Sequence, residues 1–319
     1  MIEVTKDINR AAFFLNNNEV IGMPTETVYG LAGNIYSEQA VKKIFEVKQR
    51  PFYNPLIVHI KSVEYLEKVA VEIPEQAIKL SNHFWPGPLT LLLKKHPTIP
   101  NIITAGKETV AIRIPKHPIA QSLLNLLDYP LAAPSANPFG SISPTTAEHV
   151  AEYFSEQIPV VLDGGASEKG LESTIIGFVD NQAVLFRHGA ISIEEIEEVI
   201  GKIAIKTSAK DQPDAPGMLL KHYAPKTPTF VTDDVQSMIK SFSRKKVGLI
   251  LFKDQLENSE RYYSEILSGN GDLQVAGANL YAAMHRLDKQ KLDAIIIEKL
   301  PNIGIGRSIN DRLERARFK

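Results

Sequence analysis

The 319-residue sequence contains no cysteine. That absence excludes disulfide bonds, thiolate nucleophiles, cysteine-ligated zinc and iron–sulfur clusters, and it is typical of a reducing compartment. No apolar run reaches the ~18–20 residues that cross a bilayer. Residues 1–10, MIEVTKDINR, lack the apolar stretch behind a basic start that marks a signal peptide. We therefore expect a cytoplasmic protein without membrane contact.

Several common catalytic motifs are missing as well. The sequence has no G-x-x-x-x-G-K-[ST] segment, which excludes an ordinary P-loop NTPase. It has neither G-x-S-x-G nor H-E-x-x-H, the motifs of α/β-hydrolases and zinc metallopeptidases. Its eight histidines are scattered without metal-ligand spacing. We therefore predict no dedicated metal site in the protein.

Neither sign of charge is in excess. The chain has 36 Lys and Arg residues against 37 Asp and Glu residues, a formal net charge of −1. Proteins that bind nucleic acid nonspecifically usually carry a broad basic surface. A basic binding site in this chain must therefore be local.

Hydrophobic residues make up 44% of the chain, enough for a full-sized core. At ~100–200 residues per domain, the length favours two domains. Short apolar runs bounded by Pro, Gly, Asn or charged residues predict strands at 20–23, 56–60, 89–93, 110–114, 131–133, 160–162, 174–179 and 183–186. Some of these runs follow each other with no helix between. We therefore predict an α/β fold with a mixed sheet.

Helical patterns separate many of these strands. Residues 37–47 place apolar side chains on one helical face. Ser143 and Pro144 have the pattern of an N-cap and a first helical residue, and predict a helix that runs to about residue 154. Ser192 begins a capping box, and Gly201 suits the C-terminal stop of that helix.

The apolar pattern lapses after residue 205. Residues 206–216, KTSAKDQPDAP, are polar and contain proline, which is typical of a linker. Beyond it, strands at 229–231, 247–252 and 294–297 alternate with helices at about 233–242, 276–290 and 306–317. This pattern predicts a small Rossmann-like α/β domain. We therefore divide the chain into a first domain (1–205), a linker (206–228) and a C-terminal domain (229–319).

Residues 217–228, GMLLKHYAPKTP, are unusually apolar for a linker. Met218, Leu219, Leu220 and Tyr223 need a surface to pack against, so the segment should fold back over an apolar cleft. We predict that it forms a lid that excludes water, to which His222 and Tyr223 add polar contacts. The alternative is that it only docks on the domain surface.

Polar residues cluster where several predicted elements end. Thr25 and Thr27 follow the strand at 20–23, where α/β sheets usually bind ligands, although their hydroxyls could simply close a tight turn. The run Lys48-Gln49-Arg50 ends a predicted helix, where basic residues also favour the helix dipole. The run Ser135-Ala136-Asn137 follows the strand at 131–133, and its polar residues are common in loops. Taken singly, each cluster has a local structural explanation.

Together, Lys48-Gln49-Arg50 and Ser135-Ala136-Asn137 resemble the K-x-R…S-x-N signature of the YrdC-like family. The runs at 24–31 (PTETVYGL), 54–60 (NPLIVHI), 85–90 (WPGPLT), 109–113 (TVAIR) and 172–175 (ESTI) occur in the order that this family shows. The runs at 216–218 (PGM) and 222–225 (HYAP) resemble the linker of its longer, two-domain threonylcarbamoyl-AMP synthases. The resemblance covers essentially the whole chain. It implies a YrdC-like domain, with a twisted mixed sheet and flanking helices, followed by a small Rossmann-like domain.

The resemblance also implies a reaction. L-threonine, bicarbonate and ATP would form threonylcarbamoyl-adenylate and pyrophosphate, the first step of threonylcarbamoyladenosine modification of tRNAs that read codons beginning with A. The nucleophile is a carbamate that is already anionic, so the site mainly needs cations that neutralise phosphate charge. Lys48 and Arg50 are the expected catalytic cations, and Arg187 is a candidate third.

Site residues follow from the same resemblance. The expected nucleotide-side residues are Lys48, Arg50, Asn54, Thr109, Ser135, Asn137, Ser143, Arg187 and Tyr223. The expected threonine-side residues are Thr25, His59, Arg113 and Ser173. Arg113 is our choice for the threonine carboxylate, because its strand is otherwise apolar on both faces and the arginine should point into a cleft.

Cofactor and partners are implied as well. Mg²⁺ should accompany the triphosphate, held by phosphate oxygens and water and not by a protein cage. The labile adenylate should pass to the tRNA threonylcarbamoyl transferase machinery, and direct RNA contact is a further possibility.

Two other functions compete with this one. A carbamoyltransferase of the hydrogenase-maturation type would adenylate carbamoyl phosphate, but such relatives carry cysteine-rich zinc motifs and further large domains. An RNA-binding module would leave Thr25, Arg113 and Ser173 without a purpose. ATP–pyrophosphate exchange, measured with and without threonine and bicarbonate, separates the three functions.

Overall fold

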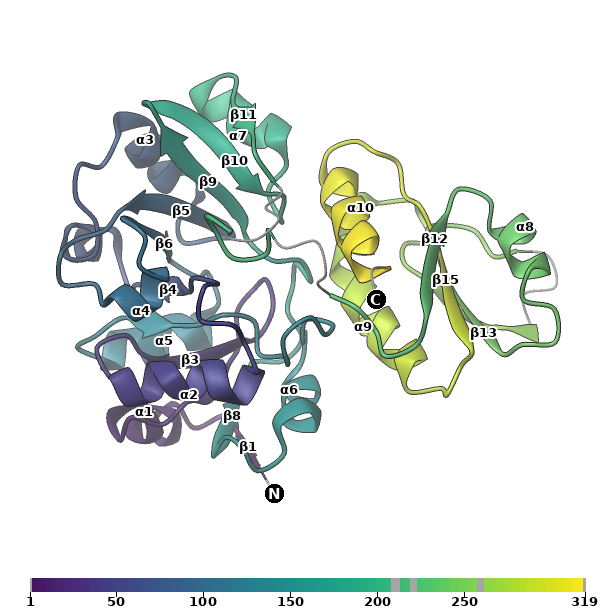
Figure 1. The fold of residues 1–319 in the computed structure, drawn as a ribbon, viewed down its shortest axis with the longest axis horizontal. Coiled ribbons are helices and arrows are strands. Elements are labelled where there is room, and N and C mark those ends of the chain that lie inside the picture. The colour runs from purple at the N-terminus through teal and green to yellow at the C-terminus, as the bar shows by residue number, and fades with distance from the viewer. Residues whose placement is uncertain (1, 208–212, 219–222, 257–260, 318–319) are drawn as a thin grey trace.

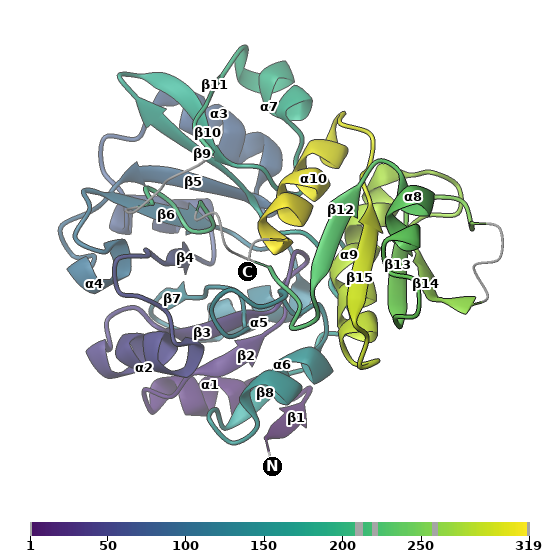
Figure 2. The same cartoon turned by 45° about the vertical axis from the view of Figure 1, so that its right-hand side comes forward.

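The computed structural model describes residues 2–207, 213–218, 223–256 and 261–317, which form two α/β units (Figures 1 and 2). The first unit is built on an 11-stranded sheet in the order β1-β8-β2-β3-β7-β4-β6-β5-β9-β10-β11. Its strands are β1 (Glu3–Thr5), β2 (Ile21–Met23), β3 (Gly30–Asn34), β4 (Ile57–His59), β5 (Leu89–Lys94), β6 (Thr109–Arg113), β7 (Leu131–Ala132), β8 (Val160–Leu162), β9 (Thr174–Val179), β10 (Gln182–Arg187) and β11 (Ala204–Ile205). Its helices are α1 (Ile8–Asn16), α2 (Glu38–Lys48), η1 (Val63–Lys68), α3 (Glu75–Phe84), α4 (Asn101–Thr104), α5 (Pro118–Leu126), α6 (Ala147–Phe154) and α7 (Ile193–Ile200).

The first sheet is mixed, as the sequence predicts. The β4/β6 and β5/β9 pairs are parallel, whereas β5/β6 and β9/β10 are antiparallel. All eight predicted strands of this unit are present, and no predicted end differs from the observed one by more than one residue. Parallel β4 and β6 end at His59 and Arg113, which are paired in register. Two candidate site residues therefore meet at one edge of the sheet.

Three strands of this unit were not predicted. Strand β3 has the sequence GLAGN, which lacks β-branched and aromatic residues, and β1 and β11 are very short. Such segments carry little local strand signal. Strand β3 forms because it can pair antiparallel with β2 on one side and β7 on the other. Its existence is a tertiary effect.

The predicted start of the helix near residue 143 is wrong. Helix α6 begins at Ala147, and its N-cap is Thr146, whose hydroxyl accepts a hydrogen bond from the backbone N–H of His149. Ser143 lies before the helix, and its buried hydroxyl donates to the Glu172 carboxylate at 2.6 Å. A long-range acceptor thus replaces the local cap. The capping box at Ser192 and the end of α7 at Gly201 are confirmed.

The second unit is a four-stranded parallel sheet in the order β12-β15-β13-β14. Its elements are β12 (Thr229–Thr232), α8 (Val235–Lys240), β13 (Val247–Leu251), β14 (Tyr263–Ile266), α9 (Leu273–Asp288), β15 (Ala294–Glu298) and α10 (Ile305–Ala316). The three predicted strands and helices are present, and the half-exposed strand β14 was not predicted. Helices α9 and α10 lie on the side of this sheet that faces the first unit, and α8 lies on the other side (Figure 1).

An apolar cluster joins the two units. Leu280, Tyr281 and Leu313 of the second unit pack in one cluster with Val28 and Leu171 of the first. A separate core of the first unit, centred on residues such as Ile44, Leu91 and Ile112, contains no residue beyond Ile203. The first unit therefore has its own core, while the docked face of the second unit shares its apolar contacts with it.

The linker packs on the first unit. Met218 is fully buried in a cluster with Ile57, Ala111, Val184 and other residues of one sheet face. The sequence predicts such a docked apolar segment, although Leu219, Leu220 and His222 lie outside the described residues. The first sheet ends at Ile205 and the second begins at Thr229.

None of the helices in the described part of the chain has the length and apolarity needed to cross a membrane.

Candidate active site

A pocket opens where β4, β6 and β10 end and where the loops after β2 and β7 pass. Its lining residues are Thr25, Thr27, Val28, Tyr29, Gly30, Arg50, Ile57, His59, Arg113, Ala133, Pro134, Ser135, Glu172, Ser173, Arg187, Pro216, Gly217 and Tyr223. The linker thus closes one side of a cavity built by the first unit. The space left for water-sized groups is about 40 Å³, which is room for about three water molecules.

Arg113, at the end of β6, is held on three sides. Its Nη1 donates to the Thr27 hydroxyl at 2.7 Å, its Nε donates to the Gly87 carbonyl at 3.1 Å, and its Nη2 lies 2.8 Å from a Glu26 carboxylate oxygen. Arg113 and Glu26 are 4% and 3% exposed, so this is a buried ion pair. The arginine is oriented before any ligand arrives.

The turn after β2 combines local and functional roles. The Thr25 hydroxyl donates to the Val28 carbonyl at 2.6 Å and shares a hydrogen bond of 2.8 Å with the Thr27 hydroxyl. Thr25 therefore closes a tight turn, the local explanation considered from the sequence. The same turn places Thr25 and Thr27 in the pocket lining, next to Arg113.

His59 lines the pocket with an imidazole ring that carries no charge. Burial, reinforced by the positive charge of Arg113, lowers the pKa of His59 to about 3. The imidazole is therefore uncharged at neutral pH. It can donate or accept a hydrogen bond but adds no charge beside Arg113.

Lys48 does not line the pocket, but it contacts Ser135, which does. It ends α2, is 1% exposed, and its ammonium group donates to the backbone carbonyls of Ser135 and Asn137. Burial, followed by the charge of Arg50, holds the pKa of Lys48 well below its usual value. These contacts explain physically why the K-x-R and S-x-N motifs occur together: the lysine of one anchors the loop that carries the other.

Arg50 reaches the pocket itself. Its Nη2 donates at 2.7 Å to both the Asn54 side-chain oxygen and the Pro55 carbonyl. Burial, despite an opposing effect of Tyr223, lowers the pKa of Arg50 to about 9. At neutral pH the guanidinium is still charged, and Asn54 fixes its direction from behind.

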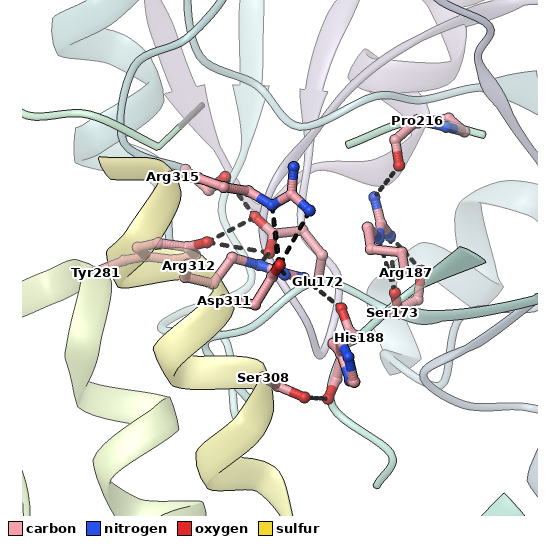
Figure 3. Close-up of polar contacts among 12 residues, drawn as sticks. Glu172, Ser173, Arg187, His188, Pro216, Tyr281, Ser308, Asp311, Arg312 and Arg315 are labelled. Atoms are coloured by element: carbon pink, nitrogen blue, oxygen red, sulfur yellow. Dashed lines mark hydrogen bonds and ion pairs between the residues drawn. The ribbon is translucent and has the colours of Figure 1, made fainter. Parts of the chain in front are cut away.

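Arg187 joins the pocket wall to the linker. Its Nη2 donates to the carbonyl and hydroxyl of Ser173 at 2.8 and 2.9 Å, and its Nη1 donates to the Pro216 carbonyl at 3.2 Å (Figure 3). Gly217 has a φ of +84°, and a Cβ there would lie 2.9 Å from Arg187 Cδ and 3.0 Å from the Tyr223 hydroxyl. Only glycine lets the linker approach this closely.

The structure divides the sequence-predicted residues into two groups. The lining includes Thr25, Arg50, His59, Arg113, Ser135, Ser173, Arg187 and Tyr223. It does not include Lys48, Asn54, Thr109, Asn137 or Ser143. Lys48 and Asn54 support lining residues through hydrogen bonds, and Ser143 binds Glu172. Thr109 begins β6, the strand that Arg113 ends.

Several residues in the pocket lining or next to it were not predicted individually from the sequence. Glu26 lies within the PTET run, and Tyr29 holds the adjacent loop by donating to the Gly165 carbonyl at 2.7 Å. Glu172, which is 5% exposed, binds Ser143 of the first unit. It also binds Tyr281 and Arg312 of the second unit (Figure 3). Glu26 lies in the run at 24–31 and Glu172 in the run at 172–175, so the family resemblance marked both segments without giving either carboxylate a role.

Glu172 is the one carboxylate among the described residues that line the pocket, and it already accepts three side-chain hydrogen-bond donors. No group of three or more His, Asp or Glu residues within the described ranges is placed to hold a metal ion.

Comparisons with known proteins agree along the whole chain. Residues 14–189 match the protein family described as "Telomere recombination", and residues 191–317 match the one described as "Threonylcarbamoyl-AMP synthase, C-terminal domain". The chain is 42% identical to a threonylcarbamoyl-AMP synthase of Pyrococcus abyssi over 97% of its own length and 93% of the relative's. It is 41% identical to that of Bacillus subtilis, covering 97% of this chain and 92% of the relative.

A solved structure is similar over both units. The crystal structure of P. abyssi Sua5 complexed with L-threonine superposes with a TM-score of 0.91 at 40% sequence identity. The match covers 99% of this chain and 97% of the other. With its two units, its linker-closed pocket and its full-length relatives, the chain belongs to the threonylcarbamoyl-AMP synthase family, in the two-domain form.

Proposed function

We propose that the pocket makes threonylcarbamoyl-adenylate from L-threonine, bicarbonate and ATP, for modification of tRNAs that read codons beginning with A. The threonine amine and bicarbonate form a carbamate with loss of water, the carbamate oxygen attacks the α-phosphate of ATP, and pyrophosphate leaves. The observation that carries this proposal is the convergence of Arg50, Arg113 and Arg187 in one pocket. Three cations suit a reaction that brings a carboxylate, a carbamate and a triphosphate together.

We assign Arg113 to the threonine carboxylate. Its fork geometry suits bidentate carboxylate binding, and the hydroxyls of Thr25 and Ser173 and the neutral ring of His59 line the same cavity. In P. abyssi Sua5, L-threonine is the bound ligand. A polar pocket of this kind would select threonine through its hydroxyl, because an analogue without it leaves buried polar groups unpaired.

We assign Arg50, Arg187 and Ser135 to the nucleotide phosphates, with Lys48 and Asn54 as supports. Arg50 is aimed by Asn54, and Ser135 belongs to the loop that Lys48 anchors. Thr109, Asn137, Ser143 and Tyr223 complete the proposed nucleotide side. Mg²⁺ would accompany the triphosphate, and the metal ion and the arginines would together neutralise the negative charge of the phosphates.

We propose that the linker is a lid over this reaction. The segment with Pro216, Gly217 and Tyr223 lines one side of the pocket, and we infer that it moves aside to admit substrates. In its closed position it excludes water from a hydrolysable mixed anhydride.

Gly217→Ala tests the lid without removing a polar group. The added Cβ meets Arg187 and Tyr223, and the positive φ strains alanine, so closure should weaken. We expect more ATP consumed per threonylcarbamoyl-adenylate recovered. Gly271→Ala is the control, because Gly271 has a similar φ of +75° and its Cβ would meet only the flexible Lys253 side chain. If both variants couple ATP consumption to product equally well, the linker does not act as a lid and only joins the two units.

The activity itself is tested by incubating the full chain with ATP, labelled bicarbonate and L-threonine. We expect labelled threonylcarbamoyl-adenylate and stoichiometric pyrophosphate, and ATP–pyrophosphate exchange that requires both threonine and bicarbonate. Exchange that needs carbamoyl phosphate instead would support a carbamoyltransferase. No exchange, with RNA bound tightly, would support a binding module.

The lability of the product favours a direct hand-off. An acyl-adenylate hydrolyses in water, so we propose direct transfer to the tRNA threonylcarbamoyl transferase machinery in the cytoplasm. Co-purification with that machinery, and crosslinking to tRNA, test the protein and RNA contacts separately.

A further inference from the structure

Both units contribute to the environment of one buried carboxylate, that of Glu172. Its Oε1 accepts from the Ser143 hydroxyl at 2.6 Å, and the Tyr281 hydroxyl lies 3.1 and 3.0 Å from its two oxygens. Its Oε2 accepts from Arg312 Nε at 2.8 Å. Ser143 belongs to the first unit, whereas Tyr281 and Arg312 come from α9 and α10 (Figure 3). The carboxylate is therefore held by donors from both sides of the interface.

Arg312 is placed by several contacts at once. It is 1% exposed, and besides Glu172 it donates to the His188 carbonyl and to Asp311, each at 2.6 Å. Burial raises the pKa of Glu172, but the charges of Arg312 and Arg187, together with the hydrogen bonds from Ser143 and Arg312, outweigh burial and lower it. The pair is thus ionised inside the protein, where losing one partner leaves an uncompensated charge.

This network continues into the pocket wall. Glu172 lines the pocket, and the next residue, Ser173, accepts from Arg187. The guanidinium carbon of Arg312 lies 4.9 Å from the centre of the Tyr223 ring, and that ring stacks on Tyr281 at 5.8 Å. Arg312 therefore touches two lining residues, Glu172 and Tyr223, from outside the cavity.

Other ion pairs across the interface have no such connection. Arg307 of α10 pairs with Glu194 of α7, and their side chains are 32% and 49% exposed. Neither residue lines the pocket. Exposed pairs of this kind contribute little beyond docking. The buried pair differs from them in both burial and position.

We propose that Arg312 is a positioning residue for the adenylation site, acting through Glu172 to hold the Glu172–Ser173 wall and the Tyr223 ring in their working places. The C-terminal unit would then complete the active site without contacting substrate. This inference rests on the proposed function of the pocket.

Arg312→Lys and Arg307→Lys form a matched pair of tests in the full chain. Lysine at 312 keeps the charge that Glu172 needs, so the fold is retained, but it cannot donate at once to Glu172, Asp311 and the His188 carbonyl. We expect kcat/KM for threonine to fall about 10–100-fold in Arg312→Lys, because small displacements at a reacting site carry costs of that size. Arg307→Lys should stay within about twofold, as expected for an exposed pair. Equal kinetics in the two variants, per folded molecule, would overturn the proposal even if both lower the melting temperature.

A double-mutant cycle tests the route through Glu172. Glu172→Gln, Arg312→Met and the double variant are compared by kcat/KM. If Arg312 acts through Glu172, the double variant loses no more than the worse single variant, because removing both charges leaves no unpaired ion. Losses that multiply would refute that route. Should Arg312→Met fail to fold, recovery of folding in the double variant still supports coupling, and failure of both contradicts it.

Calorimetric titration with ATP separates this inference from the proposed function. A wild-type chain that binds ATP but makes no threonylcarbamoyl-adenylate refutes the function, and the positioning role is then decided by ATP affinity in Arg312→Lys against Arg307→Lys. Equal affinity overturns it, and a loss of about tenfold or more supports it. A wild-type chain that binds neither ATP nor threonine overturns both.

Discussion

Buried arginines define the pocket at the scale of single residues. Arg50, Arg113 and Arg187 are 6%, 4% and 5% exposed. Burying a guanidinium is costly unless its donors are paired, and each of these three is held by carbonyl, hydroxyl or carboxylate oxygens. The pairing fixes where the remaining donors point. Orientation, more than charge alone, is therefore what substitutions should disturb.

Arg113→Lys tests this orientation. A lysine retains the charge but cannot contact Thr27, Glu26 and the Gly87 carbonyl at once, so threonine affinity should fall about tenfold or more while ATP affinity changes little. Calorimetric titration with each ligand measures both effects. Arg286→Lys is the control, since Arg286 makes an exposed fork to Glu265 in the second unit. Weaker ATP binding with normal threonine binding would move Arg113 to the nucleotide side.

Lys48→Met tests the anchor of the loop at 135–137. Methionine keeps most of the buried volume but removes the ammonium that binds the Ser135 and Asn137 carbonyls. Without this anchor the loop would shift relative to Arg50. We therefore expect pyrophosphate release to fall about 10²-fold. Lys42→Met, on the exposed face of the same helix, is the control. Near-normal turnover in Lys48→Met would show that this lysine does not support the site.

At the scale of elements, α6 and α9 meet through two histidines. The rings of His149 and His285 stack with centroids 3.8 Å apart, and the His285 ring contacts the Ser143 carbonyl at 3.2 Å. Burial is the main cause that lowers the pKa of His149 to about 4 and that of His285 to about 3. The charge of Lys289 further disfavours protonation of His149, and the stacked His149 ring disfavours a second positive charge on His285. Both rings are therefore neutral when the units are docked.

Acid should accordingly weaken the docking of α9 on α6. An unfolded histidine takes up its proton near pH 6.5, whereas the docked rings resist protonation until about pH 4 and 3. The unfolded chain thus binds more protons in this window, and stability falls as the pH drops through it. We expect the melting temperature to drop less between pH 7.5 and 5 in His285→Phe than in the wild type. The exposed His83→Phe variant should follow the wild type, and a His285→Phe curve parallel to both would contradict the argument.

At the scale of the whole molecule, the first unit should fold alone but work poorly. Its main core contains no residue beyond Ile203, so a chain cut after Ile205 keeps that core. The cut removes Tyr223, the linker cover, and the Tyr281 and Arg312 donors to Glu172. We expect the truncated protein to make at least about 10-fold less threonylcarbamoyl-adenylate per ATP consumed, because water reaches the site and the wall loses its support. Circular dichroism checks folding, and tight coupling of ATP to product would show that the second unit is dispensable.

How far the sequence predicts the site depends on the kind of residue. Thr25 and Arg113 could be proposed from their places after and near the end of predictable strands, and Arg187 as a third cation for the reaction that the family resemblance implies. The structure places all three in the pocket lining. Ser143 could be selected as a site residue, but its predicted role as a helix N-cap was wrong. Its hydroxyl binds Glu172, which is 29 residues away in the chain. No periodicity encodes that partnership.

The sequence by itself determined most of the strands, the helices at 37–47 and 192–201 and those of the second unit, the mixed first sheet and the family, because apolar periodicity, caps and motif order are local properties of the chain. Tertiary structure alone decided that β3 would pair between β2 and β7, that Lys48 would stand behind the pocket, and that Arg312 would reach Glu172 across 140 residues. Those outcomes depend on the free energy of burying charged and polar groups, which is settled only when distant segments supply their partners.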